Sequence, residues 1–159
     1  MQIVRWLSIN GNFNKSRDIY YDRVNPFQGK TKSAGLGLSF QPNAHVQQNV
    51  DYNRVAFDRL SDGERIYTVH IVNTQSTYQF DKHFRVRLLE QFDSSQRRLL
   101  TDFLAMYEVA PGTVFHAGYG SLYEKQTAPI GSLVPNNLNP HYTTVSRGLF
   151  FKASYRHRF

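Results

Sequence analysis

Polar and apolar residues alternate along several segments of this chain, and this pattern predicts β-strands with one apolar and one polar face. The segment 149–159 alternates most clearly, because most apolar residues stand at odd-numbered positions and the polar residues at even-numbered ones. Positions that are all odd or all even are described as sharing one parity. The apolar parity holds Leu149, Phe151, Ala153, Tyr155 and Phe159, interrupted by His157, and the polar parity holds Lys152, Ser154, Arg156 and Arg158. We therefore expect a C-terminal strand that ends in a phenylalanine.

Turn-forming residues divide the rest of the chain into further strands. The expected strands are 2–13, 33–41, 45–57, 64–80, 83–93, 98–109 and 113–123. Tight turns are expected at 42–44, 81–82 and 110–112, and long external loops near 14–32 and 124–146. Because the short connections alternate with longer ones, the short turns fall at one end of an antiparallel meander, as in outer-membrane barrels.

The segment 64–80 departs from the regular alternation. Tyr67, Val69 and Ile71 share one parity, whereas Val72, Tyr78 and Phe80 share the other. A β-bulge near Asn73 would exchange the two faces of the strand, and we expect one there.

Residues 83–107 also permit a helical interpretation. Leu99, Leu100, Phe103, Leu104 and Tyr107 stand at helical spacing, and Gln, Arg and Leu are good helix formers. This keeps open a soluble α+β fold. The regular alternation of 83–91 and the expected strands on both sides favour an all-β fold.

Composition changes the picture in three ways. The 159 residues suffice for a single domain, 1–159, and the absence of cysteine excludes disulfides and thiolate metal sites. The net charge is +7, and the aromatic residues are unusually numerous, with 10 Tyr, 12 Phe and 1 Trp. No apolar run approaches the roughly 18 residues of a membrane helix. The mean hydropathy of −0.51 does not argue against a barrel, since only half of each barrel strand faces lipid.

The N-terminal residues lack the basic head, apolar stretch and cleavage site of a signal peptide. A barrel with this start is expected to be a mature form or part of a longer chain.

Glycine, serine and charged residues occupy the same parity in several strands. Burying such residues without partners is costly, so we expect them to face a lumen and the apolar parity to face lipid. The sequence thus predicts an all-β, antiparallel up-and-down transmembrane β-barrel of about eight strands, or the C-terminal part of a larger one. The alternative is a soluble lipocalin-like binding protein, whose apolar pocket would lie inside.

Charged residues on the polar parity are the candidate lumen groups: Arg85, Arg87, Asp102, Glu108, Lys152, Arg156 and Arg158. We expect the cations among them to pair with Asp51, Asp102 and Glu108. Aromatic residues expected at the membrane interfaces are Tyr52, Tyr107, Tyr119, Tyr123, Phe151 and Tyr155. The expected assembly signal consists of Phe151, Tyr155 and Phe159.

Catalysis and metal binding find little support in the sequence. The 6 histidines show no metal-ligand spacing, so no metal or other cofactor is expected. His116 and Asp102 on neighbouring strands would form a possible catalytic pair, but no recognisable nucleophile accompanies them. The expectation is a protein that is not an enzyme.

A basic first loop suggests an anionic partner. The loop contains Lys15, Arg17, Arg23, Lys30 and Lys32, interleaved with aromatic residues. Such interleaving is also used to grip nucleic acid. In the expected topology the loop is external and faces lipopolysaccharide phosphates, so we expect lipid and lipopolysaccharide as partners and no nucleic acid.

Three stretches resemble a known bacterial family. They are TYQFDKHFRVRL at 77–88, YEVAPGTVFHAGYG at 107–120 and RGLFFKASYRHRF at 147–159. They resemble the C-terminal end of a family with a domain of unknown function, in which a domain like the family-nine carbohydrate-binding modules precedes an outer-membrane barrel. The resemblance implies an outer-membrane location, insertion by the barrel-assembly machinery, and a role as anchor or passage for a periplasmic or upstream domain. This sequence departs from the family pattern in not including the carbohydrate-binding part, so a sugar-binding role is not expected of it. The family's activity is undefined, and no catalytic residue is carried over.

Overall fold

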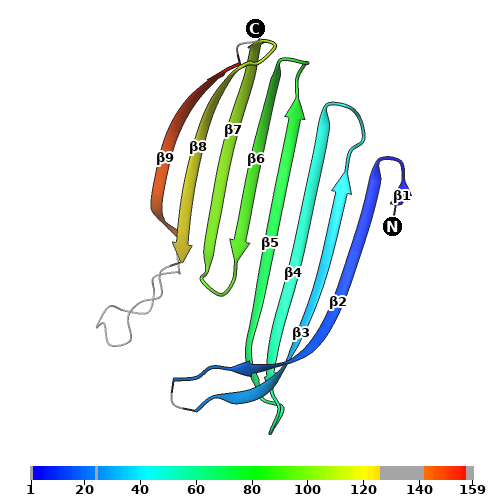
Figure 1. Ribbon diagram of the computed structural model, residues 1–159, viewed down its shortest axis with the longest axis vertical. Coiled ribbons are helices and arrows are strands. Elements are labelled where there is room, and N and C mark those ends of the chain that lie inside the picture. The colour runs from blue at the N-terminus through cyan, green and yellow to red at the C-terminus, as the bar shows by residue number, and fades with distance from the viewer. Residues whose placement is uncertain (1, 24, 126–141, 157–159) are drawn as a thin grey trace.

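The computed structural model describes residues 2–23, 25–125 and 142–156, which form one antiparallel sheet without helices. The strands are β1 (Gln2–Val4), β2 (Leu7–Tyr20), β3 (Phe27–Phe40), β4 (Val46–Arg59), β5 (Arg65–Gln79), β6 (Phe84–Asp93), β7 (Arg98–Ala110), β8 (Thr113–Lys125) and β9 (Tyr142–Tyr155). They lie side by side in chain order (Figure 1). Eight are long, and the short β1 pairs with the start of β2. The predicted antiparallel meander of eight strands is confirmed.

The helical interpretation of 83–107 is wrong, because these residues form β6, a turn and most of β7. The spacing of four between Leu99, Phe103 and Tyr107 suits a helix but also places all three on one face of a strand. The register pairs Phe103 with Leu88 and Tyr107 with Phe84, so the alternation of β6 continues across β7.

The turns 41–45, 80–83 and 111–112 all lie at one end of the sheet, here called the short-turn end, as predicted. The long loop predicted at 14–32 is wrong. The ladder between β2 and β3 continues without interruption to the pair Tyr20–Phe27. Backbone pairing requires no apolar side chain, so polar residues on both faces did not stop these strands. Residues 2–13 are likewise not one strand, since a turn separates β1 from β2.

The loop predicted at 124–146 also differs at its ends. Residues 124 and 125 belong to β8, and β9 begins at Tyr142, while residues 126–141 lie outside the described part of the chain.

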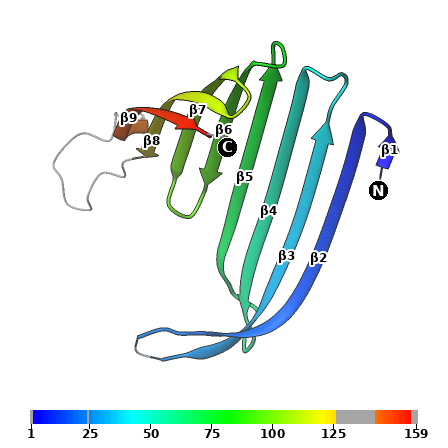
Figure 2. The same ribbon diagram turned by 45° about the horizontal axis from the view of Figure 1, so that its top comes forward.

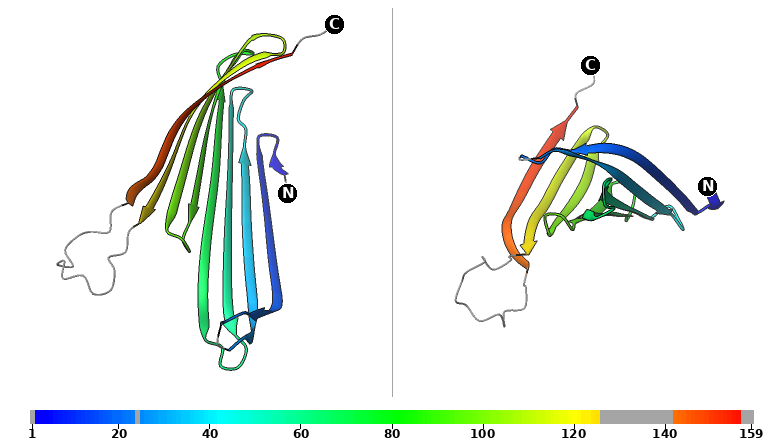
Figure 3. Two further views of the ribbon diagram at one scale, coloured as in Figure 1. Left: turned by 60° about the vertical axis from the view of Figure 1, so that its left-hand side comes forward. Right: turned by 90° about the horizontal axis from the view of Figure 1, so that it is seen from below.

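The sheet is strongly curved. Tyr20 on β2 and Tyr67 on β5 bring their ring centroids to 6.4 Å, although β3 and β4 lie between their strands. The face that carries these two rings is therefore the inside of the curve, here called the concave face, and the opposite face is convex. Figures 2 and 3 show the curvature, with the far ends of β2 and β3 bending across the ends of β4 and β5.

The sheet is not closed. Among the described residues, β9 pairs only with β8, and β1 covers only the beginning of the outer edge of β2 (Figure 3). The two free edges lie on opposite sides of the sheet (Figure 1).

A conventional hydrophobic core is missing from the described residues. The buried hydrophobic residues there are Ala56 and Phe57 alone. The accessible surface is 12249 Å², whereas a compact monomer of 18.5 kDa is expected to expose about 8,200 Å². A single curved sheet has no second layer against which it can bury a face.

Candidate functional site: the two faces of the curved sheet

The convex face carries an apolar band that crosses all eight long strands. Cross-strand pairs place at least one aliphatic or aromatic residue of each long strand on this face, for example Leu36 with Tyr52 and Tyr119 with Leu149. Several are largely exposed: Phe13 (71%), Leu36 (52%), Phe103 (43%), Leu149 (71%) and Phe151 (79%). Soluble monomers rarely expose such a large continuous apolar surface, so this face requires an apolar neighbour.

An aromatic belt borders the apolar band at the short-turn end. It consists of Trp6, Phe40, Tyr78, Phe80, Phe84, Tyr107, Phe115 and Tyr155. Trp6 and Phe40 meet edge to face at 5.5 Å. The chain of contacts from Tyr78 through Phe80 and Phe84 to Tyr107 has centroid distances of 4.6, 4.9 and 6.3 Å. Amphipathic rings at one level are typical of an interface between membrane and water.

All six aromatic residues predicted for the interfaces lie on the convex face, and Tyr107 and Tyr155 belong to the belt. The prediction missed the other belt residues: Trp6, Phe40, Tyr78, Phe80, Phe84 and Phe115. Their alignment depends on the register between strands, which sequence parity within each strand does not reveal.

The concave face is polar on β2–β5 at the level of the apolar band, whereas on β6–β9 it mixes charged residues with apolar ones such as Leu89, Leu100, Leu104 and Phe150. On β2–β5 it carries Asn10, Asn12, Asn49, Asp51, Asn53, Asn73 and Gln75. Two glycines make room for these side chains. A Cβ atom at Gly35 would collide with Oδ1 of Asn12, and one at Gly37 would lie 2.5 Å from Oδ1 of Asn10. The small residues that alternate along β3 therefore lie on the concave face, as predicted.

The predicted lumen charges share the concave face where the structure describes them. Arg85, Arg87, Asp102, Glu108 and Lys152 all lie there, Arg156 follows the end of β9, and Arg158 is outside the described residues. The expected ion pairs are not formed by the described cations Arg85, Arg87, Lys152 and Arg156. The ion pairs between described residues lie elsewhere, because the register sets Arg85 opposite Met106 and Arg87 opposite Leu104.

The polarity of the two faces inverts where β2–β5 extend beyond the apolar band. On the concave side, four aromatic residues pack in one cluster: Tyr20, Phe27, Phe57 and Tyr67. The rings of Phe57 and Tyr67 are stacked with their centroids 5.5 Å apart, and Phe57 is only 2% exposed. On the convex side, polar and basic residues replace the apolar ones.

This inversion explains the irregular pattern of 64–80. The predicted bulge near Asn73 is wrong, because β5 pairs with β4 and β6 in unbroken register around that residue. Instead, Tyr67, Val69 and Ile71 face the concave cluster, and Val72 and Tyr78 face the convex band. The register shift lies further along, between Phe57 and Asp58.

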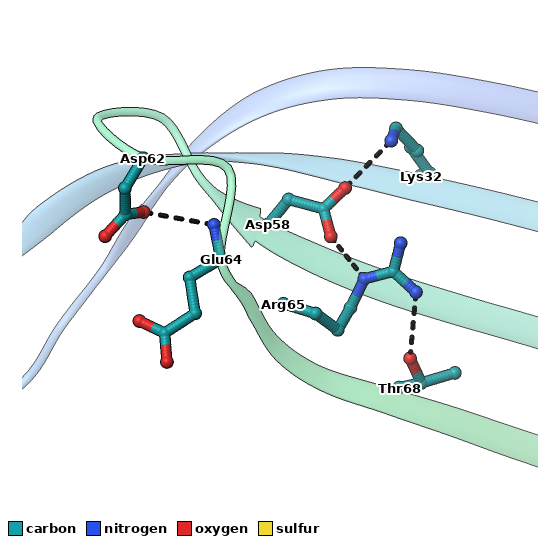
Figure 4. A network of polar contacts seen from close by, with 6 residues as sticks. All are labelled: Lys32, Asp58, Asp62, Glu64, Arg65 and Thr68. Carbon is teal, nitrogen blue, oxygen red and sulfur yellow. Dashed lines mark hydrogen bonds and ion pairs between the residues drawn. The ribbon is translucent and has the colours of Figure 1, made fainter.

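An ion-pair network lies on the convex side of this extension. The Asp58 carboxylate accepts a hydrogen bond from Nζ of Lys32 at 2.8 Å and another from Nε of Arg65 (Figure 4). Asp58 is 8% exposed, so it is well placed to neutralise two of the surrounding cations.

Two of the described histidines, His45 and His70, have hydrogen-bond partners, and His116 lies far from its expected partner Asp102. Nδ1 of His70 lies 2.8 Å from the Tyr52 hydroxyl, and Nδ1 of His45 lies 2.6 Å from the Gln79 carbonyl. His116 faces Met106, whereas Asp102 faces Gly120, four residues along the strand. Their separation is therefore about 13 Å, and the possible catalytic pair is not formed. Within the described ranges, no group of three metal-ligating side chains occurs.

Acidic residues stabilise two of the turns. Oδ1 of Asp81 accepts hydrogen bonds from the backbone N–H groups of His83 (2.7 Å) and Phe84 (2.8 Å), which lowers the pKa of Asp81. The N–H of Glu64 and the Arg59 guanidinium lower the pKa of Asp62 in the same way.

Two members of the predicted assembly signal are exposed on the convex face of the free edge strand β9. Phe151 is 79% exposed and Tyr155 is 73% exposed. Phe159, the third, lies outside the described residues.

The comparisons with known proteins add no relative. No family model, curated protein or solved structure matches the chain. Among the described residues, the structure has no helix of the length and apolarity that a membrane span requires.

Proposed function

We propose that this chain is an integral outer-membrane β-barrel, or the C-terminal part of a larger one, that serves as a membrane anchor or translocation component and not as an enzyme. The uncovered apolar band on the convex face is the observation that carries the proposal. Burial of apolar surface contributes about 25 cal/mol per Å², so leaving this band in water would forgo most of the stabilisation that a sheet of this size can gain.

The order of the layers along the strands supports the same proposal. An aromatic belt lies at the short-turn end, then an apolar band, and then a polar extension on the same face. Transmembrane barrels combine short periplasmic turns with longer strands and loops outside the membrane. The short-turn end is therefore assigned to the periplasmic side.

The free edges support closure of the sheet. A long unpaired edge strand is an aggregation hazard, and barrels abolish such edges. β2 and β9 run in opposite directions, since they are the first and last of eight long antiparallel strands. They can therefore pair with each other or with additional strands in the membrane.

The concave face, with the polar residues of β2–β5 and the charged residues of β6–β9, is assigned to the lumen. A closed barrel of eight strands is filled by its own side chains, which suits an anchor better than a channel. In a wider barrel, Arg85, Arg87 and Lys152 would line the passage and favour anions. A lipocalin-like protein would require the opposite arrangement, an apolar interior and a polar exterior.

The experiment is refolding of the chain with and without a neutral detergent. We expect a monomer that forms only in detergent or lipid vesicles, and whose migration in a denaturing gel changes after boiling. Circular dichroism should show the same strand content before and after transfer into vesicles. A stable monomer that remains in the aqueous phase without detergent would refute the proposal.

A further inference from the structure

Uncompensated cations gather on the convex face directly beyond the apolar band. They are Lys15 and Arg17 on β2, Lys30 on β3 and Arg54 on β4, here called the basic patch. None of the four forms an ion pair with another described residue. Asp58, the acidic residue that the structure describes on this part of the face, is already engaged by Lys32 and Arg65 (Figure 4).

The register places like charges directly opposite each other. Lys15 faces Lys32, and the next pair on the same face is Arg17 with Lys30. Side chains in such pairs have Cβ atoms about 4.5–5.5 Å apart, and like charges there are destabilising. Asp58 offsets part of the first repulsion through its ion pair with Lys32, whereas the Arg17–Lys30 pair has no acidic partner among the described residues. The remaining repulsion lowers the stability of the isolated protein, and an anion that bridges Lys15, Arg17 and Lys30 would remove this cost.

The neighbourhood indicates which anion fits. Phe13 precedes Lys15 by one position on the same face, and Leu36 on β3, opposite Gly11, lies one position further into the band; they are 71% and 52% exposed. The basic patch and the apolar band are thus continuous, about 7 Å apart along the strand. A nucleic acid would use the cations but leave the apolar residues uncovered. A lipid with phosphates on its headgroup covers both.

We propose that the basic patch binds the phosphate groups of a phosphorylated glycolipid of the outer leaflet, whose acyl chains lie on Phe13 and Leu36. The site rests on the proposed function and deepens it by naming a specific lipid class. Arg23, which the sequence grouped with these cations, lies beyond the end of β2 and is not part of the patch.

The test compares the wild-type protein, refolded in neutral detergent, with two variants. Lys15→Gln/Lys30→Gln removes one cation from each repulsive pair. Arg85→Gln/Arg87→Gln removes two cations from the concave face and serves as the matched control. Each protein is titrated with diphosphoryl lipid A, with the same lipid lacking phosphates, and with inorganic phosphate, and binding is measured by native mass spectrometry.

We expect diphosphoryl lipid A to bind the wild-type protein and the control alike, and the patch variant at least tenfold more weakly. A basic residue near an anionic lipid surface contributes about a fivefold change in affinity, so two residues suffice for this loss. The dephosphorylated lipid and inorganic phosphate are each expected to bind at least tenfold more weakly than diphosphoryl lipid A. Equal affinity of the patch variant, or of either comparison ligand, would overturn the site.

A second measurement keeps the test informative if the variant refolds poorly. In detergent without added lipid, Lys15→Gln/Lys30→Gln should raise the melting temperature, because two like-charge contacts are lost. A lower melting temperature would contradict the repulsion on which the site depends. If the protein needs detergent to fold but does not bind lipid A, the lipid site is refuted and the proposed membrane function is not.

Discussion

Tyr20 and Tyr67 lie 6.4 Å apart across a sheet in which two strands separate them, and this contact fixes the inside of the curve. Every assignment of convex and concave positions follows from it through the continuous register. Phe57 lies beneath both rings, and one edge of its own ring covers Gly29 on the neighbouring strand.

Replacing Phe57 tests whether this cluster holds the far ends of β2–β5 together. Phe57→Ala should destabilise the protein by about 3 kcal/mol, since it removes a fully buried aromatic side chain. Urea unfolding in neutral detergent measures the change. Leu36→Ala, at an exposed convex position, is the control and should have a clearly smaller effect. Equal losses for both variants would show that the cluster has no special role.

A charge placed in the middle of the apolar band distinguishes a lipid-facing surface from a water-facing one. In vesicles, Phe103→Arg should cost about 2–4 kcal/mol of stability, as for arginine at the midplane of a barrel. Leu100→Arg, on the concave side of the same strand, is the control and should cost much less. In water, a Phe103 that is 43% exposed would tolerate arginine without loss, and that result would argue against a membrane.

Disulfide formation tests whether the free edges meet. Because the chain has no cysteine, a pair introduced at Asn12 and Ser154 reports on one contact alone. Both positions lie on the concave face: Ser154 is next to the short-turn end of β9, and Asn12 is five residues from that end of β2. Two double variants are compared, Asn12→Cys/Ser154→Cys and Asn10→Cys/Ser154→Cys. If the chain closes into a barrel of eight strands, at least one of them should form an intramolecular disulfide after refolding and oxidation.

The pair Asn12→Cys/Ser146→Cys is the control, since Ser146 lies near the opposite end of β9. Crosslinked dimers in place of crosslinked monomers would indicate that the edges pair between copies. No crosslink with either partner of Ser154→Cys would favour additional strands between the edges.

The Asp81 turn should depend on pH. The pKa of Asp81 is lowered by two backbone hydrogen bonds that its carboxylate accepts, from the N–H groups of His83 and Phe84. A carboxyl group with a lowered pKa adds stability above its unfolded value of 3.8, and this contribution is lost as the pH falls through the folded value. Titration by NMR should therefore give a pKa below 3.8 for Asp81.

Asp81→Asn keeps an acceptor for both N–H groups but does not ionise, so it should retain the turn and lose this pH dependence. Asp81→Ala removes the acceptor and should loosen the turn at every pH. A titration of Asp81 at or above its ordinary value would contradict the role of the two hydrogen bonds.

The sequence predicted the eight strands because each crosses the apolar band, where alternation is strong. It failed beyond that band. At 14–18 of β2 and 28–33 of β3 both faces are polar or carry glycine, so the strands continue to Tyr20 and Phe27 without the pattern that reveals them. Segment 64–80 misled for the opposite reason, since β5 is apolar first on one face and then on the other, and a bulge was inferred where none exists.

The candidate site was predictable in part. Parity alone assigned Arg85, Arg87, Asp102, Glu108 and Lys152 to one face correctly. Their failure to pair, and the separation of His116 from Asp102, depend on the stagger of neighbouring strands. That stagger is set by the length of each turn and by register shifts such as the one between Glu108 and Ala110, which parity does not record.

The inversion of polarity along β2–β5 has a consequence for the depth at which the protein sits. If the convex face lies in a bilayer, moving it inward by one residue pair would carry Lys15 and Lys32 into hydrocarbon. Moving it outward by one pair would lift Phe13 and its partner Ala34 into water. Either displacement exchanges a favourable contact for an unfavourable one, so the side chains of these strands would themselves set how deeply the sheet sits in the membrane.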